Sequence, residues 1–171
     1  MTILDICTWL EATPLAVAIS ESEWLYPTIE TVHVLALTMV FGSIAMLDLR
    51  LLGVANRNRG VMRMTNETLP WTWIAFVIAT ISGSLLFVSA ATKYYENTPF
   101  RIKLVLLAMA GVNMAVFHLT GYRSVALWDN RLPTPRAARI AAGLSLVIWL
   151  GVVFAGRWIG FVDAEQDPFQ Q

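Results

Sequence analysis

Two histidines, His33 and His118, are the residues of this sequence whose chemistry most needs an explanation. Each lies within a long apolar segment, where an ionisable side chain is costly and marks a functional candidate. A neutral imidazole is the commonest side-chain ligand for metals, and it also binds haem iron. The two histidines therefore predict ligation of haem iron or another metal. Hydrogen bonding between helices and proton transfer are the alternatives.

The other residue types narrow the choice of metal. Structural zinc needs close clusters of cysteine and histidine, and Cys7 is the single cysteine of the chain. A di-iron bundle needs Glu-x-x-His on two helices, and Glu30 with His33 forms one such pair with no second. Haem needs only one or two axial ligands on bundle helices. Haem b is therefore the leading prediction, and copper bound by histidine and methionine ranks below it.

The depths of the two histidines disfavour a single haem between them. At 1.5 Å rise per residue, His33 and His118 differ in height by on the order of 15 Å. One possibility is that each histidine binds its own haem, with Met109 completing the iron at His33 and Met46 at His118. The other is that a cyclic oligomer brings copies of one histidine together.

Nearby charged residues could support such a cofactor. Haem propionates need cations, and the candidates are Arg101, Lys103 and Arg157 for His33, and Arg50 and Arg123 for His118. The alternative for each is that it extends to lipid headgroups at the membrane surface. Glu30 is expected to share a helix face with His33, where it could orient the imidazole. Asp48 and Arg50 are predicted to pair with each other.

The segments that position these residues are apolar blocks. Hydrophobic residues make up 57% of the 171 positions and charged residues 14%, against about 25% charged residues in soluble domains. The blocks cover about residues 24–47, 69–91, 100–122 and 140–161, and each is long enough to cross a bilayer as a helix. The sequence therefore predicts an all-α fold, a four-helix transmembrane bundle that forms one domain over residues 1–171.

The N-terminal segment differs from the four blocks. Residues 1–19 lack a basic start and contain Asp5, Glu11 and Pro14, so no cleavable signal peptide is predicted. A short helix lying at the membrane interface is expected instead. A single cysteine forms no disulfide within the chain, and a formal net charge of zero gives no indication of nucleic-acid binding.

The basic residues predict the orientation. Eight of the twelve lie in the loops after the first and third predicted spans: Arg50, Arg57, Arg59, Arg63, Arg123, Arg131, Arg136 and Arg139. Because basic loops stay in the cytoplasm, both termini are predicted to lie outside. Gly151 with Ala155 and Gly156 with Gly160 give small residues four apart, which suit close packing within the bundle or in a homo-oligomer.

Several runs carry a resemblance to a known family. Residues 30–35 and 47–53, together with residues 101–104, Asn113 and the pair Phe117-His118, resemble a family of small four-helix bacterial membrane proteins of unknown function. The resemblance covers roughly residues 22–160 and implies a bacterial inner-membrane protein. More loosely, the chain is similar in architecture to membrane haem b cytochromes and to the membrane part of copper-resistance proteins.

Three functions compete at this point. The first is a b-type haem protein that carries electrons within or across the membrane, with a quinol or a periplasmic redox protein as partner. The second is a non-redox small transporter, proton path or assembly subunit. The third is a copper site that combines a histidine with methionines. The sequence contains no phosphate loop, dinucleotide fingerprint or nucleophile elbow, so no soluble-enzyme chemistry is indicated.

Overall fold

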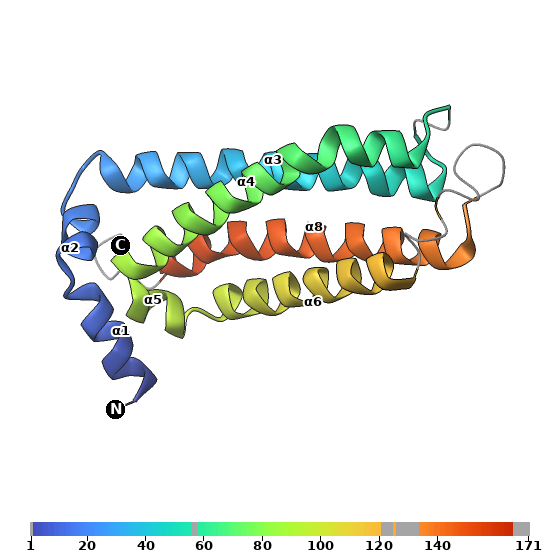
Figure 1. Cartoon of the computed structure of the whole chain (residues 1–171). Helices are drawn as coiled ribbons and strands as arrows, with labels where there is room; N and C mark the ends of the chain where they lie inside the picture. Colours follow the sequence, from blue (N-terminus) through green and yellow to red (C-terminus); the bar gives the residue numbers. More distant parts are fainter. Residues whose placement is uncertain (1, 56–57, 121–124, 126–133, 166–171) are drawn as a thin grey trace.

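The fold is all-α, as the sequence predicts. The computed structural model describes residues 2–55, 58–120, 125 and 134–165, and the elements within these ranges are helices (Figure 1). They are α1 (Ile3–Glu11), α2 (Pro14–Ser20), α3 (Leu25–Leu52), α4 (Val61–Ser89), α5 (Ala91–Glu96), α6 (Thr98–Thr120) and α8 (Arg136–Glu165).

The four long helices are apolar enough to cross a membrane, which confirms a multi-pass protein with four candidate spans. The helices extend beyond the predicted apolar blocks, most of all in α4, which begins at Val61 rather than near Leu69. Its first two turns mix polar residues with Val61, Met62 and Met64, and Pro70 lies inside the helix. Proline usually marks a helix start or a break, and the continuous apolar pattern begins only beside Pro70. The sequence pattern therefore did not predict the first two turns of α4.

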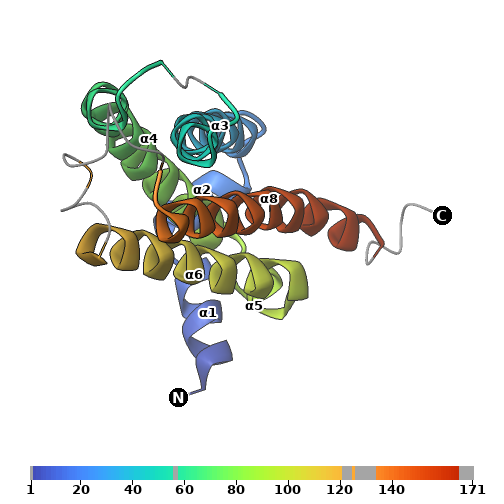
Figure 2. The ribbon, with the colours of Figure 1, turned by 90° about the vertical axis from the view of Figure 1, so that its right-hand side faces the viewer.

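The bundle consists of two helix pairs. The helix α3 packs against α4, α6 packs against α8, and contacts between α3 and α8 join the pairs. Among the described residues, no Cα atom of α4 comes within 8 Å of one in α6 or α8. In Figure 2 the view is nearly along α3, while α6 and α8 run across it and the labelled part of α4 lies apart from α6. The bundle is therefore less tightly closed between α4 and α6 than elsewhere.

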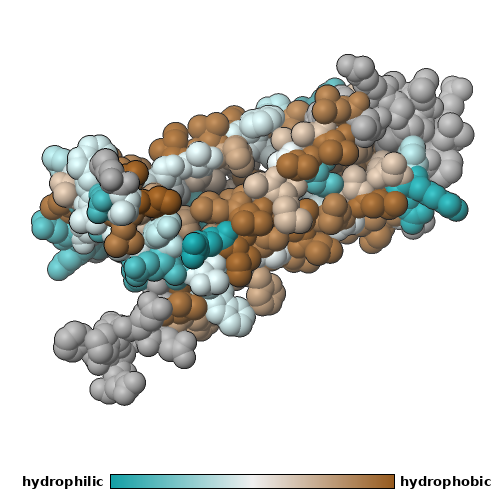
Figure 3. Space-filling model, turned by 90° about the horizontal axis from the view of Figure 1, so that it is seen from below, coloured by the Kyte–Doolittle hydropathy of each residue, from teal (hydrophilic) through white to brown (hydrophobic). Residues whose placement is uncertain are grey.

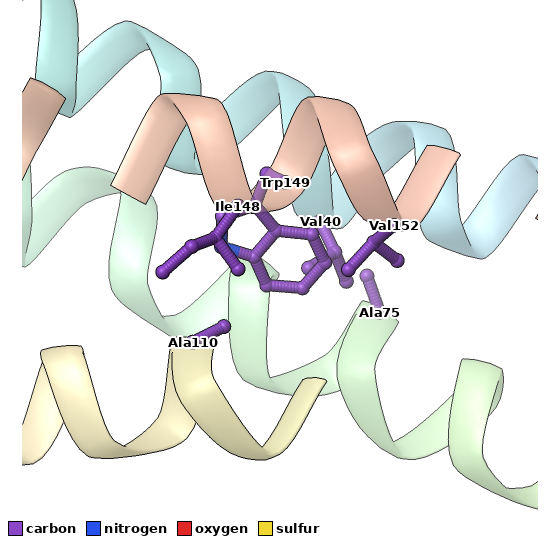
Figure 4. Close-up of a cluster of buried hydrophobic side chains, with 6 residues drawn as sticks. All are labelled: Val40, Ala75, Ala110, Ile148, Trp149 and Val152. Atoms are coloured by element: carbon purple, nitrogen blue, oxygen red, sulfur yellow. The ribbon is translucent and has the colours of Figure 1, made fainter. Parts of the chain in front are cut away.

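One cluster of buried side chains draws on all four long helices. Trp149 of α8 is 7% exposed and packs with small residues on two other helices, Ala75 of α4 and Ala110 of α6 (Figure 4). Val40 of α3 and Val152 of α8 complete the contact around the indole ring. The two alanines leave room for the ring, so this tryptophan lies where the two helix pairs meet.

The outside of the bundle is apolar, the reverse of a soluble protein. Large side chains such as Val105, Leu119 and Val147 are more than half exposed. Brown, apolar residues cover most of the face seen in Figure 3, and most teal, polar residues lie toward its two ends. A helix that is apolar on all sides belongs in a membrane or a large core. The composition of this surface therefore matches a lipid bilayer as its surroundings.

The N-terminal segment forms two short helices rather than the single one predicted. A bend of 69° separates α1 from α2, and both run across the end of the bundle instead of along it (Figure 1). Glu11 fixes them there, because its carboxylate accepts hydrogen bonds from the backbone N–H and the hydroxyl of Thr92 in α5, at 2.8 and 3.0 Å. Cys7, a residue of α1, is buried.

The Trp149 contact gives a first prediction. Trp149→Ala opens a cavity where the two helix pairs meet and is expected to lower the free energy of unfolding by on the order of 3 kcal/mol. Trp158→Ala, on the same helix but 57% exposed, is the matched control and should change it little. Unfolding in mixed micelles, followed by circular dichroism, measures both. Equal losses in the two variants would contradict the packing role.

Candidate cofactor site

His33 lies in the third turn of α3 and faces α4. Its Nδ1 atom is 3.0 Å from the backbone carbonyl oxygen of Ala79 and 3.1 Å from the hydroxyl of Ser82. A carbonyl oxygen only accepts hydrogen bonds, so we assign the ring hydrogen to Nδ1. Ser82 in turn donates to the carbonyl of Ile78 at 2.7 Å. The ring is therefore fixed in orientation and in tautomer by the backbone of α4.

Gly83 makes this contact possible. A Cβ atom at position 83 would lie 2.8 Å from Cε1 of His33 and 3.3 Å from its Nδ1. The imidazole thus rests directly against the backbone of α4, in space that any side chain would occupy. The sequence signal for this contact is the run Ser82-Gly83-Ser84, three small residues within an otherwise bulky apolar helix.

The second ring nitrogen of His33 remains available. Within the described part of the chain, both hydrogen bonds of His33 go through Nδ1, and none reaches Nε2. With the hydrogen on Nδ1, Nε2 carries a lone pair. A histidine that binds a metal almost always donates its other N–H to a carbonyl or carboxylate. Ala79 and Ser82 fill the role that the sequence assigned to Glu30, which is exposed.

Lys103 of α6 supplies a positive charge on the His33 side of the bundle. Its charge acts on His33 across the bundle. The lysine stem lies over Gly156 of α8, where a Cβ would be 3.7 Å from both Cε and Nζ. Within the described residues Lys103 has no ion-pair partner. The site can therefore offer one nitrogen ligand and one unpaired cation to an anionic group.

The two arginines predicted for the same site lie elsewhere. Arg101 is exposed and stacks over the ring of Tyr95, with its guanidinium 5.5 Å from the ring centre. Arg157 is exposed and lies 5.9 Å from the ring centre of Phe161. It lines a shallow surface groove of about 420 Å³ at the end of α8. Arg123 lies outside the described residues.

The candidate methionine ligands face the surface. Met109 of α6 and Met46 of α3 are each 46% exposed. The neighbour Ala110, not Met109, points into the buried cluster, because adjacent positions on a helix face different directions. Iron ligation by either methionine thus requires a changed side-chain conformation or a contact with a second chain.

His118 lies far from His33 along the bundle. It is part of the last turn of α6, and its side chain is outside the described part of the structure. The helix positions Lys103 near His33, and His118 follows 15 residues later on the same helix. At 1.5 Å per residue this is roughly 22 Å. The fold thus separates the two histidines instead of placing them on one cofactor.

Comparison with known proteins gives a family. A model described as a family of unknown function, DUF6644, matches residues 7–162, which include both histidines and nearly all of the four long helices. No curated protein and no solved structure matches the chain. The geometry around His33 is therefore the main guide to what the chain does.

The Gly83 contact generates the second prediction. Gly83→Ala should push the imidazole off α4 and break its hydrogen bonds, which lowers the free energy of unfolding by about 1–3 kcal/mol. Gly42→Ala is the matched control on α3, because a Cβ there meets no atom within 4 Å. Unfolding in mixed micelles measures both. A Gly83→Ala variant as stable as Gly42→Ala would show that the ring does not depend on this contact.

Proposed function

The chain belongs to DUF6644, a family of unknown function, and we propose that it is a b-type haem protein carrying electrons within or across a bacterial inner membrane. His33 is the axial ligand in this proposal, through Nε2. The observation that carries it is the hydrogen bond from Nδ1 to the carbonyl oxygen of Ala79. That bond leaves Nε2 free to coordinate a metal and fixes the direction in which its lone pair points.

The hydrogen bonds of His33 also suit the electronic demands on an axial ligand. A carbonyl acceptor at Nδ1 increases the basicity of Nε2 and holds the ring plane still. Second-shell hydrogen bonds and burial are among the features by which proteins set the potential of a haem. Ala79 and Ser82 are the residues that would do so here.

Lys103 supports the binding of an anionic cofactor at the same level. A haem brings two propionates, and a cation without an ion-pair partner among the described residues can neutralise one of them. The separation of α4 from α6 is also consistent with a flat group between helices, since such a group cannot enter where backbones are in close contact. When bound, haem supplies the one-electron chemistry, and the chain's residues orient it and exclude water.

The second axial position is open in this proposal. The described residues place no second histidine, and neither candidate methionine, inward at the level of His33. A cyclic homo-oligomer that brings copies of His33 to equal height is one way to complete the iron. A quinol or a periplasmic redox protein remains the proposed electron donor. His118 would form a separate site at the other end of the bundle.

An optical spectrum tests the haem proposal. The protein purified in detergent after growth with ample haem is expected to show a Soret band, and sharp α and β bands after reduction with dithionite. His33→Ala should reduce bound haem at least tenfold, and added imidazole should restore part of the spectrum by occupying the vacated position. Glu30→Gln, an exposed position one turn earlier on α3, should leave the spectrum unchanged.

Two outcomes would overturn the proposal. A featureless visible spectrum in the wild-type protein would contradict the haem proposal and favour a transporter, a proton path or an assembly subunit. A haem spectrum that survives His33→Ala but is lost in His118→Ala would keep the haem and move its ligand to the other end of the bundle. Copper bound to His33 would be recognised by metal analysis without a Soret band.

We further propose that both chain termini face the periplasm. The starts of α4 and α8 lie at one end of the bundle and α1, α2 and α5 at the other (Figure 1). The basic residues Arg59, Arg63, Arg136 and Arg139 lie at or near those starts, and basic flanks remain in the cytoplasm.

Reporter fusions check this orientation. Alkaline phosphatase, which is active only in the periplasm, is expected to be active when fused after the C-terminus and inactive when inserted after Asn58, between α3 and α4. Green fluorescent protein, which folds in the cytoplasm, should give the complementary pattern. The reverse result at both positions would place the termini in the cytoplasm.

A further inference from the structure

A buried carboxylate lies in the half of the bundle away from α1 and α2. Asp48 of α3 is 6% exposed, and its Oδ2 atom has no hydrogen-bond partner among the described residues. Glu30 of α3 and Glu67 of α4, by contrast, are exposed. An ionised carboxylate in a dry interior is costly unless a positive partner neutralises it.

A second oxygen without a partner lies nearby on α4. Thr65 is 4% exposed, and its Oγ1 atom makes no hydrogen bond among the described residues. The contacts of His33 with Ser82 and of Ser43 with Thr72 fix the antiparallel register of α3 and α4. In that register Thr65 lies opposite position 50, two residues from Asp48, or roughly 3 Å along the axis.

A third oxygen comes from α8. The Ser145 side chain lies near the Asp48 carboxyl. Three helices therefore bring one carboxylate and two hydroxyls to the same level of the bundle. Hydroxyl and carboxylate oxygens are ligands for hard cations.

The predicted pairing of Asp48 with Arg50 is not formed. Arg50 is buried, and its Nε donates to the backbone carbonyl of Arg59 at 2.6 Å. On α4, Arg63 and Glu67 form an ion pair with each other on the exposed side, at 2.8 Å. On α8, Arg139 is exposed. None of these charged groups makes a hydrogen bond to Oδ2.

We propose that Asp48, Thr65 and Ser145 form a binding site for a small monovalent cation, either a proton or Na⁺. A single carboxylate requires a single positive charge for neutrality, which favours a monovalent ion over a divalent one. An ion between Oδ2 and the Thr65 hydroxyl satisfies two buried oxygens that do not bond each other. The site lies apart from His33 and does not depend on the haem proposal.

Thermal unfolding of the full chain in detergent tests the site. A ligand that binds only the folded protein raises Tm with its concentration. If Na⁺ is the cation, Tm should rise with NaCl but not with choline chloride at equal ionic strength. If a proton is the cation, Tm should instead rise as the pH is lowered, with no difference between the two salts.

The variants decide whether the response belongs to this site. Asp48→Asn keeps the shape and removes the charge, so it should abolish the response. Thr65→Val keeps the side-chain volume and removes one ligand oxygen. The Na⁺ concentration needed for the same rise in Tm should therefore increase at least threefold. This variant also tests the site if Asp48→Asn does not fold. Glu30→Gln, an exposed carboxylate on the same helix, should respond as the wild type does.

The proposal fails in either of two cases. The first is a wild-type Tm that is independent of both Na⁺ and pH, as expected if an ordinary buried water occupies the space. The second is a dependence that Asp48→Asn and Thr65→Val both retain in full. His33→Ala should keep the cation response whatever it does to the haem spectrum, so the two proposals succeed or fail separately.

Discussion

The lipid bilayer offers no hydrogen-bond partners, so each polar group inside this bundle must find its partner within its own helix or on a neighbouring one. His33 finds one in the carbonyl oxygen of Ala79, and Ser43 accepts a hydrogen bond from Thr72 at 2.8 Å. Asn113 of α6 donates to the carbonyl of Ala141 on α8 at 3.0 Å. These contacts fix the register within each helix pair, and the positions of all other side chains follow from that register.

Close approach of helices is the second requirement, because apolar helices gain little by leaving apolar lipid. Glycine provides it at three levels. His33 rests on Gly83, Lys103 lies over Gly156, and Leu106 lies 3.1 Å from the Cβ position of Gly151. At Gly83 and Gly151 the side chain of the neighbouring helix occupies space that a Cβ atom would need, whereas a Cβ atom at Gly156 would meet Lys103 at an ordinary contact distance. Small residues thus decide where the polar and charged groups of the interior are held.

Among the described residues, we assign function to three atoms that have no hydrogen-bond partner, which are Nε2 of His33, Oδ2 of Asp48 and Oγ1 of Thr65. Nε2 of His33 makes no hydrogen bond although its ring is firmly held. Oδ2 of Asp48 is buried without a partner. Most buried polar groups in native proteins are paired, and a bound ion or cofactor is one explanation for those that are not. The site at His33 suits a cofactor that contains iron, and the site at Asp48 suits a small cation. The two sites lie in opposite halves of the bundle.

The sequence by itself determined the number of spans, their helical form and the interior location of His33, because continuous apolar length is a property of the chain alone. It did not determine which side of each helix faces inward. The long helices are apolar on all sides, so the sequence pattern does not show how each helix is rotated about its axis. Arg101 and Met109 were therefore expected at the site although they face outward, while Ala79 and Gly83 went unassigned. Only helix packing, set by close contacts such as that of His33 with Gly83, decided which side chains meet.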